Sequence, residues 1–176
     1  SHSLSTICEY IGNLDSLINI SYLIIFNNYR LPSFDFRSNK PYIRAKNLWN
    51  PDLMTNVLND CRIGTNGEDI EPNNIILTGA NTTGKSTYIR NAMLSVFLSQ
   101  TIGVTCCEII FTPFQRLFTY INIPNILRER ESLFEAEIKR CIDYCNELEK
   151  MNPNEFVFTV MDEIFTGTNP KEGISG

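Results

Sequence analysis

The sequence contains almost no histidine and no long apolar run. His2 is the only histidine among 176 residues, and none of the 6 cysteines forms a Cys-x-x-Cys pair. A structural zinc site needs clustered Cys and His ligands, so we expect reduced, buried thiols in an intracellular protein instead. The longest apolar runs, residues 22–26 and 156–161, are far too short to span a bilayer. The N-terminus shows no signal-peptide pattern, and we expect no membrane association.

Basic charge is also scarce. The chain has 15 Lys and Arg against 20 Asp and Glu, a net charge of −5. This balance excludes a domain that acts as a whole as a basic clamp for nucleic acid, so any contact with DNA would come from other parts of a larger protein. Hydrophobic residues at 43% and charged residues at 20% exclude a disordered, collagen-like or coiled-coil chain. The length predicts one domain, or one domain plus a piece of another.

The first part of the chain predicts a long helix followed by less regular segments. Apolar residues recur every three or four positions over residues 4–28, which predicts an amphipathic helix. Residues 31–41 are polar and contain two prolines, which indicates a linker. Residues 42–49 have a strand-like composition, and residues 60–74 read as a turn-rich connection.

The rest of the chain alternates short apolar runs with amphipathic segments. Strands are predicted at residues 74–78, 109–111, 117–121 and 156–161. Helices are predicted at residues 86–100 and 132–151. This alternation predicts an α/β domain with a layered, largely parallel sheet and flanking helices.

A phosphate-binding pattern follows the predicted strand at 74–78. The pattern G-x-x-x-x-G-K-[ST] is matched without exception by Gly79, Ala80, Asn81, Thr82, Thr83, Gly84, Lys85 and Ser86, and Thr87 follows. Backbone N–H groups of such a loop face phosphates, and the next helix points its positive end at the same anion. Lys85 then supplies a charge to the β/γ-phosphates and Ser86 a hydroxyl to Mg²⁺. An ordinary glycine-containing turn is disfavoured by the strand before it and the helix after it.

Two carboxylates follow the apolar strand predicted at residues 156–161. Asp162 can hold Mg²⁺, directly or through water, and Glu163 can orient or deprotonate an attacking water. Alone, the pair would read as a solvated acidic turn. Together with the loop it predicts an enzyme that cleaves ATP with water, for which Lys85 and Glu163 are the catalytic candidates.

Four segments agree in order with the motifs of one known family. The loop at 78–87 is similar to T-G-P-N-x-x-G-K-S-T, with Ala80 in place of proline, and residues 100–103 match a short x-x-I-G. Residues 129–137 are similar to S-T-F-x-x-E, and residues 162–173 to D-E-x-x-x-G-T-x-x-x-x-G. On these motifs the chain resembles the MutS family of DNA mismatch repair ATPases, which belongs to the ABC-type ATPases.

The resemblance implies a domain organisation and partners. Residues 39–176 are expected to form a P-loop NTPase domain of ABC-ATPase type, incomplete at its C-terminus, and residues 1–38 the end of a helical lever domain plus a linker. Family members dimerise, so Ser132 is expected to contact ATP bound by a second MutS-like subunit. Considered alone, Ser132 is a helix N-cap with Glu135 completing a capping box. Mismatched double-stranded DNA is expected to bind through parts of the full protein outside this chain.

Two alternatives remain open at this stage. The segment at residues 55–59 lacks the aromatic residue that commonly stacks on adenine in the family, and Leu133 replaces a threonine of the signature motif. A nucleotide-gated dimerisation module with little turnover is therefore one alternative. An ATPase of another DNA maintenance pathway is the other. Such proteins usually carry a long coiled coil between the two halves of the site, and this chain has no room for one.

Overall fold

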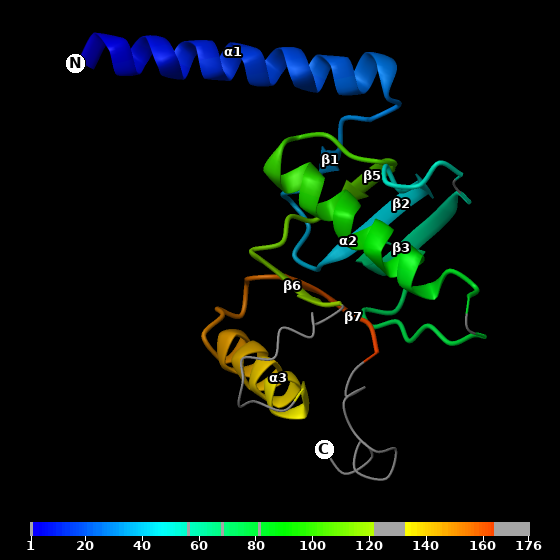
Figure 1. Ribbon diagram of the computed structural model, residues 1–176. Helices are drawn as coiled ribbons and strands as arrows, with labels where there is room; N and C mark the ends of the chain where they lie inside the picture. Colours follow the sequence, from blue (N-terminus) through cyan, green and yellow to red (C-terminus); the bar gives the residue numbers. More distant parts are fainter. Residues whose placement is uncertain (1, 56, 68, 81, 122–132, 164–176) are drawn as a thin grey trace. The chain divides into compact units, whose positions relative to one another are not determined.

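The computed structural model describes residues 2–55, 57–67, 69–80, 82–121 and 133–163 of the chain (Figure 1). The chain divides into two compact units, residues 1–113 and residues 114–176. The boundary predicted between residues 38 and 39 stays a prediction. Within the described residues, no helix is both long enough and apolar enough to cross a membrane.

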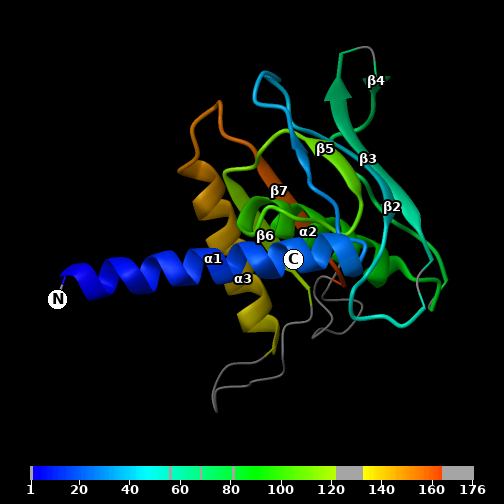
Figure 2. The ribbon, with the colours of Figure 1, turned by 90° about the horizontal axis from the view of Figure 1, so that it is seen from above.

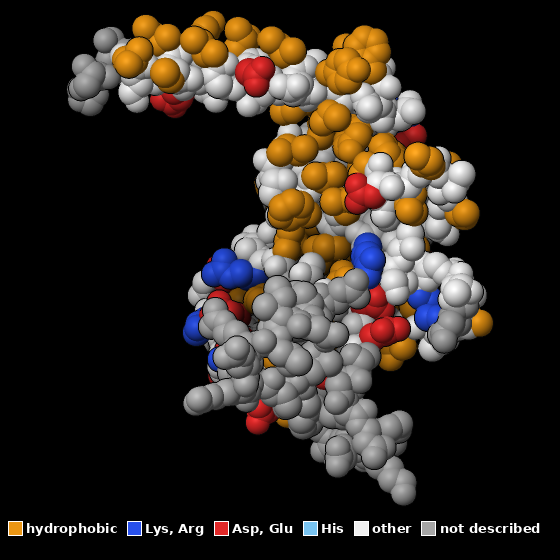
Figure 3. Space-filling model, viewed as in Figure 1, with side chains coloured by type: hydrophobic (Ala, Val, Ile, Leu, Met, Phe, Trp, Pro, Cys, Tyr) orange, Lys and Arg blue, Asp and Glu red, His pale blue; other side chains and the backbone are white. Residues whose placement is uncertain are grey.

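The first unit begins with helix α1, His2–Phe26, which confirms the helix predicted over residues 4–28. Asn28 then takes a left-handed backbone conformation (φ 59°), which asparagine tolerates better than most residues. The amide of Tyr29 still donates to the carbonyl of Leu23, and this bond closes the helix. The apolar residues that predicted the helix are exposed (Leu4, Ile7, Ile11, Leu14 and Ile18). Figure 3 shows apolar side chains along the surface of this helix.

A mixed five-stranded sheet forms the body of the first unit. Its strand order is β1 (Ser33–Phe34), β5 (Glu108–Phe111), β2 (Tyr42–Leu48), β3 (Asn59–Asn66) and β4 (Asp69–Ile70). Only β1 and β5 are parallel, and the other pairs are antiparallel. The prediction of a largely parallel sheet is therefore wrong for this unit. The reason is local: β2, β3 and β4 are joined by loops, whereas parallel neighbours need a crossover connection.

Two further predictions are corrected in this part of the chain. Residues 59–66, of which most fell in the turn-rich connection expected over 60–74, form β3. Residues 74–78 were predicted as a buried parallel strand, but they form no strand and Ile76 is 90% exposed. Both edges of β5 are already paired, and the outer strands β1 and β4 have only two residues each. The sheet therefore offers this apolar segment little backbone to pair with.

Helix α2, Lys85–Thr101, packs against the sheet over β2 (Figure 2). Of the apolar residues of this helix, Met93 and Val96 are buried, whereas Phe97 is exposed. The rest of the buried side of the helix is small or polar (Asn91, Ala92, Ser95 and Ser99). The sheet side chains Ile43, Ala45, Cys61, Ile109 and Phe111 are buried as well. The paired strands place these five on one face of the sheet, because opposed residues of neighbouring strands point to the same side.

The second unit is a strand–helix–strand crossover. β6 (Arg116–Tyr120) and β7 (Val157–Met161) are parallel neighbours, and α3 (Leu133–Glu149) connects them. This confirms the predicted alternation in this region, since a parallel pair needs such a crossover. Tyr144 of α3 packs edge-on against Phe118, and its hydroxyl lies 3.0 Å from the hydroxyl of Thr159.

The apolar spacing of the helix predicted at 132–151 indicates a buried stripe (Phe134, Ile138, Cys141, Ile142, Cys145 and Leu148). The described members of this stripe are only partly buried. Ile138, Cys141 and Leu148 are half-buried, whereas Ile142 and Cys145 are exposed. The side chain of Phe134, the remaining member, lies outside the described part. Glu137 is fully buried instead. Spacing predicted the helix but not which of its sides is covered, because coverage depends on the neighbouring strands.

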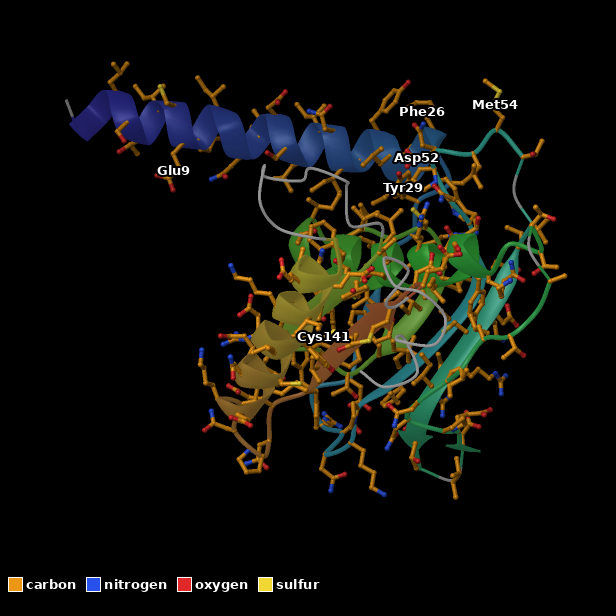
Figure 4. All side chains as sticks on the ribbon, turned by 60° about the horizontal axis from the view of Figure 1, so that its bottom comes forward. Glu9, Phe26, Tyr29, Asp52, Met54 and Cys141 are labelled. Atoms are coloured by element: carbon orange, nitrogen blue, oxygen red, sulfur yellow. The ribbon has the colours of Figure 1, made fainter. Side chains whose placement is uncertain are left out.

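The cysteines divide into two groups. All six are free thiols, and Cys61, Cys106 and Cys107 are buried in the first unit as expected. Cys141, labelled on α3 in Figure 4, is half-buried. Cys8 and Cys145 are exposed on helices, so the expectation of buried thiols is wrong for them. A cysteine side chain can lie in the core or at the surface, so the residue type alone did not predict which thiols are buried.

Candidate functional site: a phosphate loop and a carboxylate pair

The phosphate loop, residues 79–87, leads directly into α2. Gly84 is the N-cap residue of the helix, and its backbone is left-handed (φ 88°, ψ 15°). No atom lies within 4 Å of the position where a side chain would begin, so the backbone angle, and not crowding, requires glycine there. Among the described residues no side chain caps this end of α2, and its first turn carries no acidic residue. Such an end presents N–H groups and positive potential to an anion.

Side chains of the loop are bonded to the loop's own backbone. The Lys85 ammonium donates to the carbonyl oxygens of Gly79 and Ala80, each at 2.7 Å. The Thr83 hydroxyl donates to the same Ala80 oxygen at 2.8 Å. Thr82 has a left-handed backbone (φ 70°), which is unusual for a β-branched residue and is the kind of strain found at binding loops. The loop is thus a closed turn with a cation held across it.

The other predicted residues of this half are only partly described. Ser86 and Thr87 lie half-buried in the first turn of α2, immediately after the lysine. Asn81 lies outside the described residues. The structure therefore gathers Gly79, Ala80, Thr83, Gly84 and Lys85 into one compact turn, and their role in binding phosphate stays a prediction.

The carboxylate pair stands at the end of β7 in the second unit. The amide of Asp162 donates to the carbonyl of Tyr120 at 2.8 Å, which continues the pairing of β6 and β7 by one residue. Asp162 is half-buried and Glu163 exposed. Glu163 has a left-handed backbone (φ 49°), a conformation that is uncommon for a residue other than glycine. The loop belongs to the first unit and the carboxylates to the second.

The remaining predicted contacts fall outside the described part of the chain. Ser132 is one of them, as are the segments predicted to match the family after Glu163. α3 begins at Leu133, and Glu135 lies exposed in its first turn, where a capping-box glutamate would stand. Within the described residues, no three His, Cys, Asp or Glu side chains are grouped closely enough to hold a metal ion.

Sequence reasoning missed a contact of Tyr88, the residue that directly follows the phosphate loop. Its hydroxyl donates to the carbonyl of Asp60 on β3 at 3.1 Å, and the Cys61 thiol is hydrogen-bonded to the same hydroxyl. Burial, followed by the bond with Cys61, raises the pKa of Tyr88 above its ordinary value. The available signal was a tyrosine in the first turn of a helix that packs on a sheet.

Comparison with known proteins agrees with these features. The fold and the loop define a mixed α/β protein with a phosphate-loop sequence at the start of a helix. The family model described as MutS domain V matches residues 75–175. The DNA mismatch repair protein MutS of Pseudothermotoga lettingae is 31% identical over 176 residues, which cover 96% of this chain and 20% of that protein. The chain belongs to the MutS family, and it spans about a fifth of the length of this curated relative.

Proposed function

We propose that this chain is the ATP-binding and hydrolysing domain of a MutS-like DNA mismatch repair protein, an ABC-type P-loop ATPase within residues 39–176. The observation that carries the proposal is the placement of the Lys85 ammonium across a turn that opens into the uncapped end of α2. A cation and a helix N-terminus on one loop are a site for the phosphates of a nucleotide. Membership of the MutS family supports mismatch repair as the setting.

The residues of the loop fit a triphosphate. Gly79 leaves space that a side chain would take from Thr83, because a Cβ there would lie 3.3 Å from the Thr83 hydroxyl. Lys85 balances phosphate charge, and the amides at the start of α2 donate to phosphate oxygens. Asn81, Thr82, Thr83 and Thr87 complete the ATP-contacting set that we propose.

Ser86 and Asp162 are the residues that would hold Mg²⁺. A hydroxyl and a carboxylate are the hard oxygen donors this ion prefers, and one or two protein ligands suffice when phosphates and waters supply the rest. Bound there, the ion neutralises charge on the phosphates during transfer. Glu163 orients the attacking water and takes up its proton, and Lys85 stabilises the charge that develops on the phosphate oxygens.

The loop assignment is tested by titrating the full-length protein with Mg-ATP. Lys85→Ala is expected to weaken binding by at least about 100-fold, because it removes a charge-assisted contact to the phosphates. Lys46→Ala, which removes an exposed lysine of β2, is the matched control and should bind like the wild type. Equal affinity in wild type and Lys85→Ala would refute the phosphate-loop assignment.

The catalytic assignment is tested by Glu163→Gln. This variant is expected to bind Mg-ATP normally and to lose about 100-fold or more in kcat, because the amide cannot accept the proton. Glu149→Gln, an exposed glutamate at the end of α3, controls for loss of a charge.

A second candidate function, nucleotide-gated dimerisation with little turnover, is favoured by the absence of an aromatic residue at 55–59. Measured phosphate release with dimer mass separates the two, since only the enzyme releases phosphate.

We also propose that Ser132 acts in trans, on ATP bound by a second MutS-like subunit. Lys85→Ala and Ser132→Ala subunits are each expected to be inactive as homodimers. Mixing them should restore activity, because one mixed interface then combines an intact loop with an intact serine. A mixture that stays inactive would place Ser132 elsewhere.

The remaining parts of the proposal concern the whole protein. We propose that residues 1–38 are the end of a lever that links the ATPase to a DNA clamp, and that mismatched double-stranded DNA binds outside this chain. A DNA repair role implies an intracellular protein. The test is the ATPase rate of the full-length protein with mismatched and with fully paired duplexes. An ATPase of another DNA maintenance pathway would show no difference between them.

A further inference from the structure

Tyr88 connects the first turn of α2 to the sheet. Its backbone amide donates to the carbonyl of Gly84 at 2.8 Å, which closes the first helical turn on the last glycine of the phosphate loop. Its side-chain hydroxyl donates to the carbonyl of Asp60 at 3.1 Å and is also hydrogen-bonded to the Cys61 thiol. One residue therefore contacts the loop through its backbone and β3 through its side chain.

The partner on the sheet is a rigid one. Cys61 is 1% exposed and is paired with Ala45 of β2 across the sheet. At this position β3 is paired with β2, whereas β4 pairs only with Thr65 and Asn66 at the other end of the strand. An acceptor and a thiol on such a strand move little, so a side chain bonded to them is held at a defined position.

Two side chains of the phosphate loop, Thr83 and Lys85, form their hydrogen bonds within the loop itself. Residues 82–84 are exposed, and the Thr83 hydroxyl and the Lys85 ammonium donate to the loop's own carbonyl oxygens. These bonds fix the shape of the turn but do not attach it to the sheet. A loop that is ordered before its ligand arrives loses less conformational entropy on binding, and its affinity is higher for that reason.

We propose that Tyr88 is a positioning residue that holds the first turn of α2, and with it the phosphate loop, against β3 for nucleotide binding. The inference rests on the proposed function, since it concerns affinity for the same nucleotide. Tyr88 itself is not proposed to touch a phosphate. It acts through Gly84 and the amides that follow it.

The test is Tyr88→Phe in the full-length protein, which removes the hydroxyl and keeps the ring. We expect the KM for Mg-ATP to rise about fivefold, which is the change in affinity expected when one hydrogen bond is lost. The kcat should stay within about twofold of that of the wild type. A merely structural role would reduce the amount of folded protein. That loss would lower the apparent kcat and leave KM unchanged.

The chain contains a matched control. Tyr29, labelled at the end of α1 in Figure 4, is also hydrogen-bonded through its hydroxyl to a buried thiol, that of Cys106. Its ring packs edge-on against Trp49, so Tyr29→Phe removes the same kind of interaction from another place in the same unit. We expect Tyr29→Phe to lower the melting temperature about as much as Tyr88→Phe and to leave the KM unchanged.

The outcomes are distinct. A KM in Tyr88→Phe equal to that of the wild type overturns the positioning role while leaving the ATPase assignment intact. If ATP binding by the wild-type protein does not depend on Lys85, both the positioning role and the ATPase assignment are overturned. If Tyr88→Phe does not fold, Cys61→Ala removes the thiol partner alone. It should raise the KM about twofold, and an unchanged KM would overturn the inference.

Discussion

The side-chain ammonium of Lys85 lies 2.7 Å from the carbonyl oxygen of Ala80, five residues earlier in the chain. The lysine stands in the first turn of α2 and reaches back across the turn that precedes the helix. Gly84, the residue between the turn and the helix, joins the two with a left-handed backbone. The geometry of the loop is therefore sensitive to one backbone angle.

Gly84→Ala is expected to destabilise the protein by about 1–2 kcal/mol and to weaken Mg-ATP binding. The stability cost arises because an L-residue with a side chain disfavours a φ of 88°. Gly103→Ala is the matched control, since Gly103 follows the other end of α2 with φ 74° and also has open space around it. Thermal unfolding should show similar losses for both variants, and titration should show weaker ATP binding for Gly84→Ala alone. Equal ATP affinities in the two variants would show that the backbone angle at Gly84 does not affect nucleotide binding.

The sequence predicted the structure correctly where local chemistry dictates the residue type. The spacing of Gly79, Gly84 and Lys85 predicted the turn and the helix after it, and both are present. The apolar run before Asp162 likewise predicted β7 correctly. Residues 74–78 have a similar composition but form no strand, because a strand exists only when another strand pairs with it. Pairing partners are set by the whole sheet, and a local pattern carries no information about them.

Tyr88 illustrates the same limit for the site. Its role depends on a carbonyl at Asp60 and a thiol at Cys61, which lie 28 and 27 residues earlier in the sequence. No spacing rule connects residues on a strand to a helix that follows a long loop. The exposed helix α1 is a further case, since spacing predicted its apolar stripe but not that the stripe would be uncovered.

The β3–β4 hairpin provides a second glycine comparison. Gly64 has φ 74°, and a Cβ added there would lie 2.1 Å from the carbonyl oxygen of Pro41. We expect Gly64→Ala to cost about 3 kcal/mol or more, because backbone atoms would have to shift and the φ is itself unfavourable. Gly67→Ala has a similar φ of 59° with nothing near the added atom, and should cost about 1 kcal/mol. Chemical denaturation measures both, and equal losses would contradict the steric argument.

Arg44 is expected to stabilise the same hairpin through the fork of its guanidinium. It pairs with the Asp69 carboxylate at 2.6 Å and donates to the carbonyl oxygens of Ile63, Gly64 and Asp69. Its side chain is 13% exposed, so these acceptors are partly withdrawn from water. Arg44→Lys keeps the charge but cannot reach several acceptors in one plane, and we expect a loss of about 2 kcal/mol.

The control for this prediction lies directly opposite on the next strand. Arg62 is paired with Arg44 in the β2–β3 register and is exposed. Arg62→Lys should change the free energy of unfolding by less than about 0.5 kcal/mol. Losses of similar size in the two variants would show that charge on this face, and not the fork geometry of Arg44, determines stability.

Reactivity of the six thiols is predicted to follow their surroundings. Burial raises the pKa of the Cys106 thiol to about 11, and burial also raises the pKa of Cys61 and Cys107. A raised pKa leaves less of the reactive thiolate at pH 8, and burial limits access as well.

The exposed Cys8 and Cys145 should therefore be alkylated first by iodoacetamide in the native protein. Peptide mass spectrometry identifies the sites, and denatured protein is the control, in which all six should react. Early labelling of Cys61, Cys106 or Cys107 would show that the sheet of the first unit opens readily.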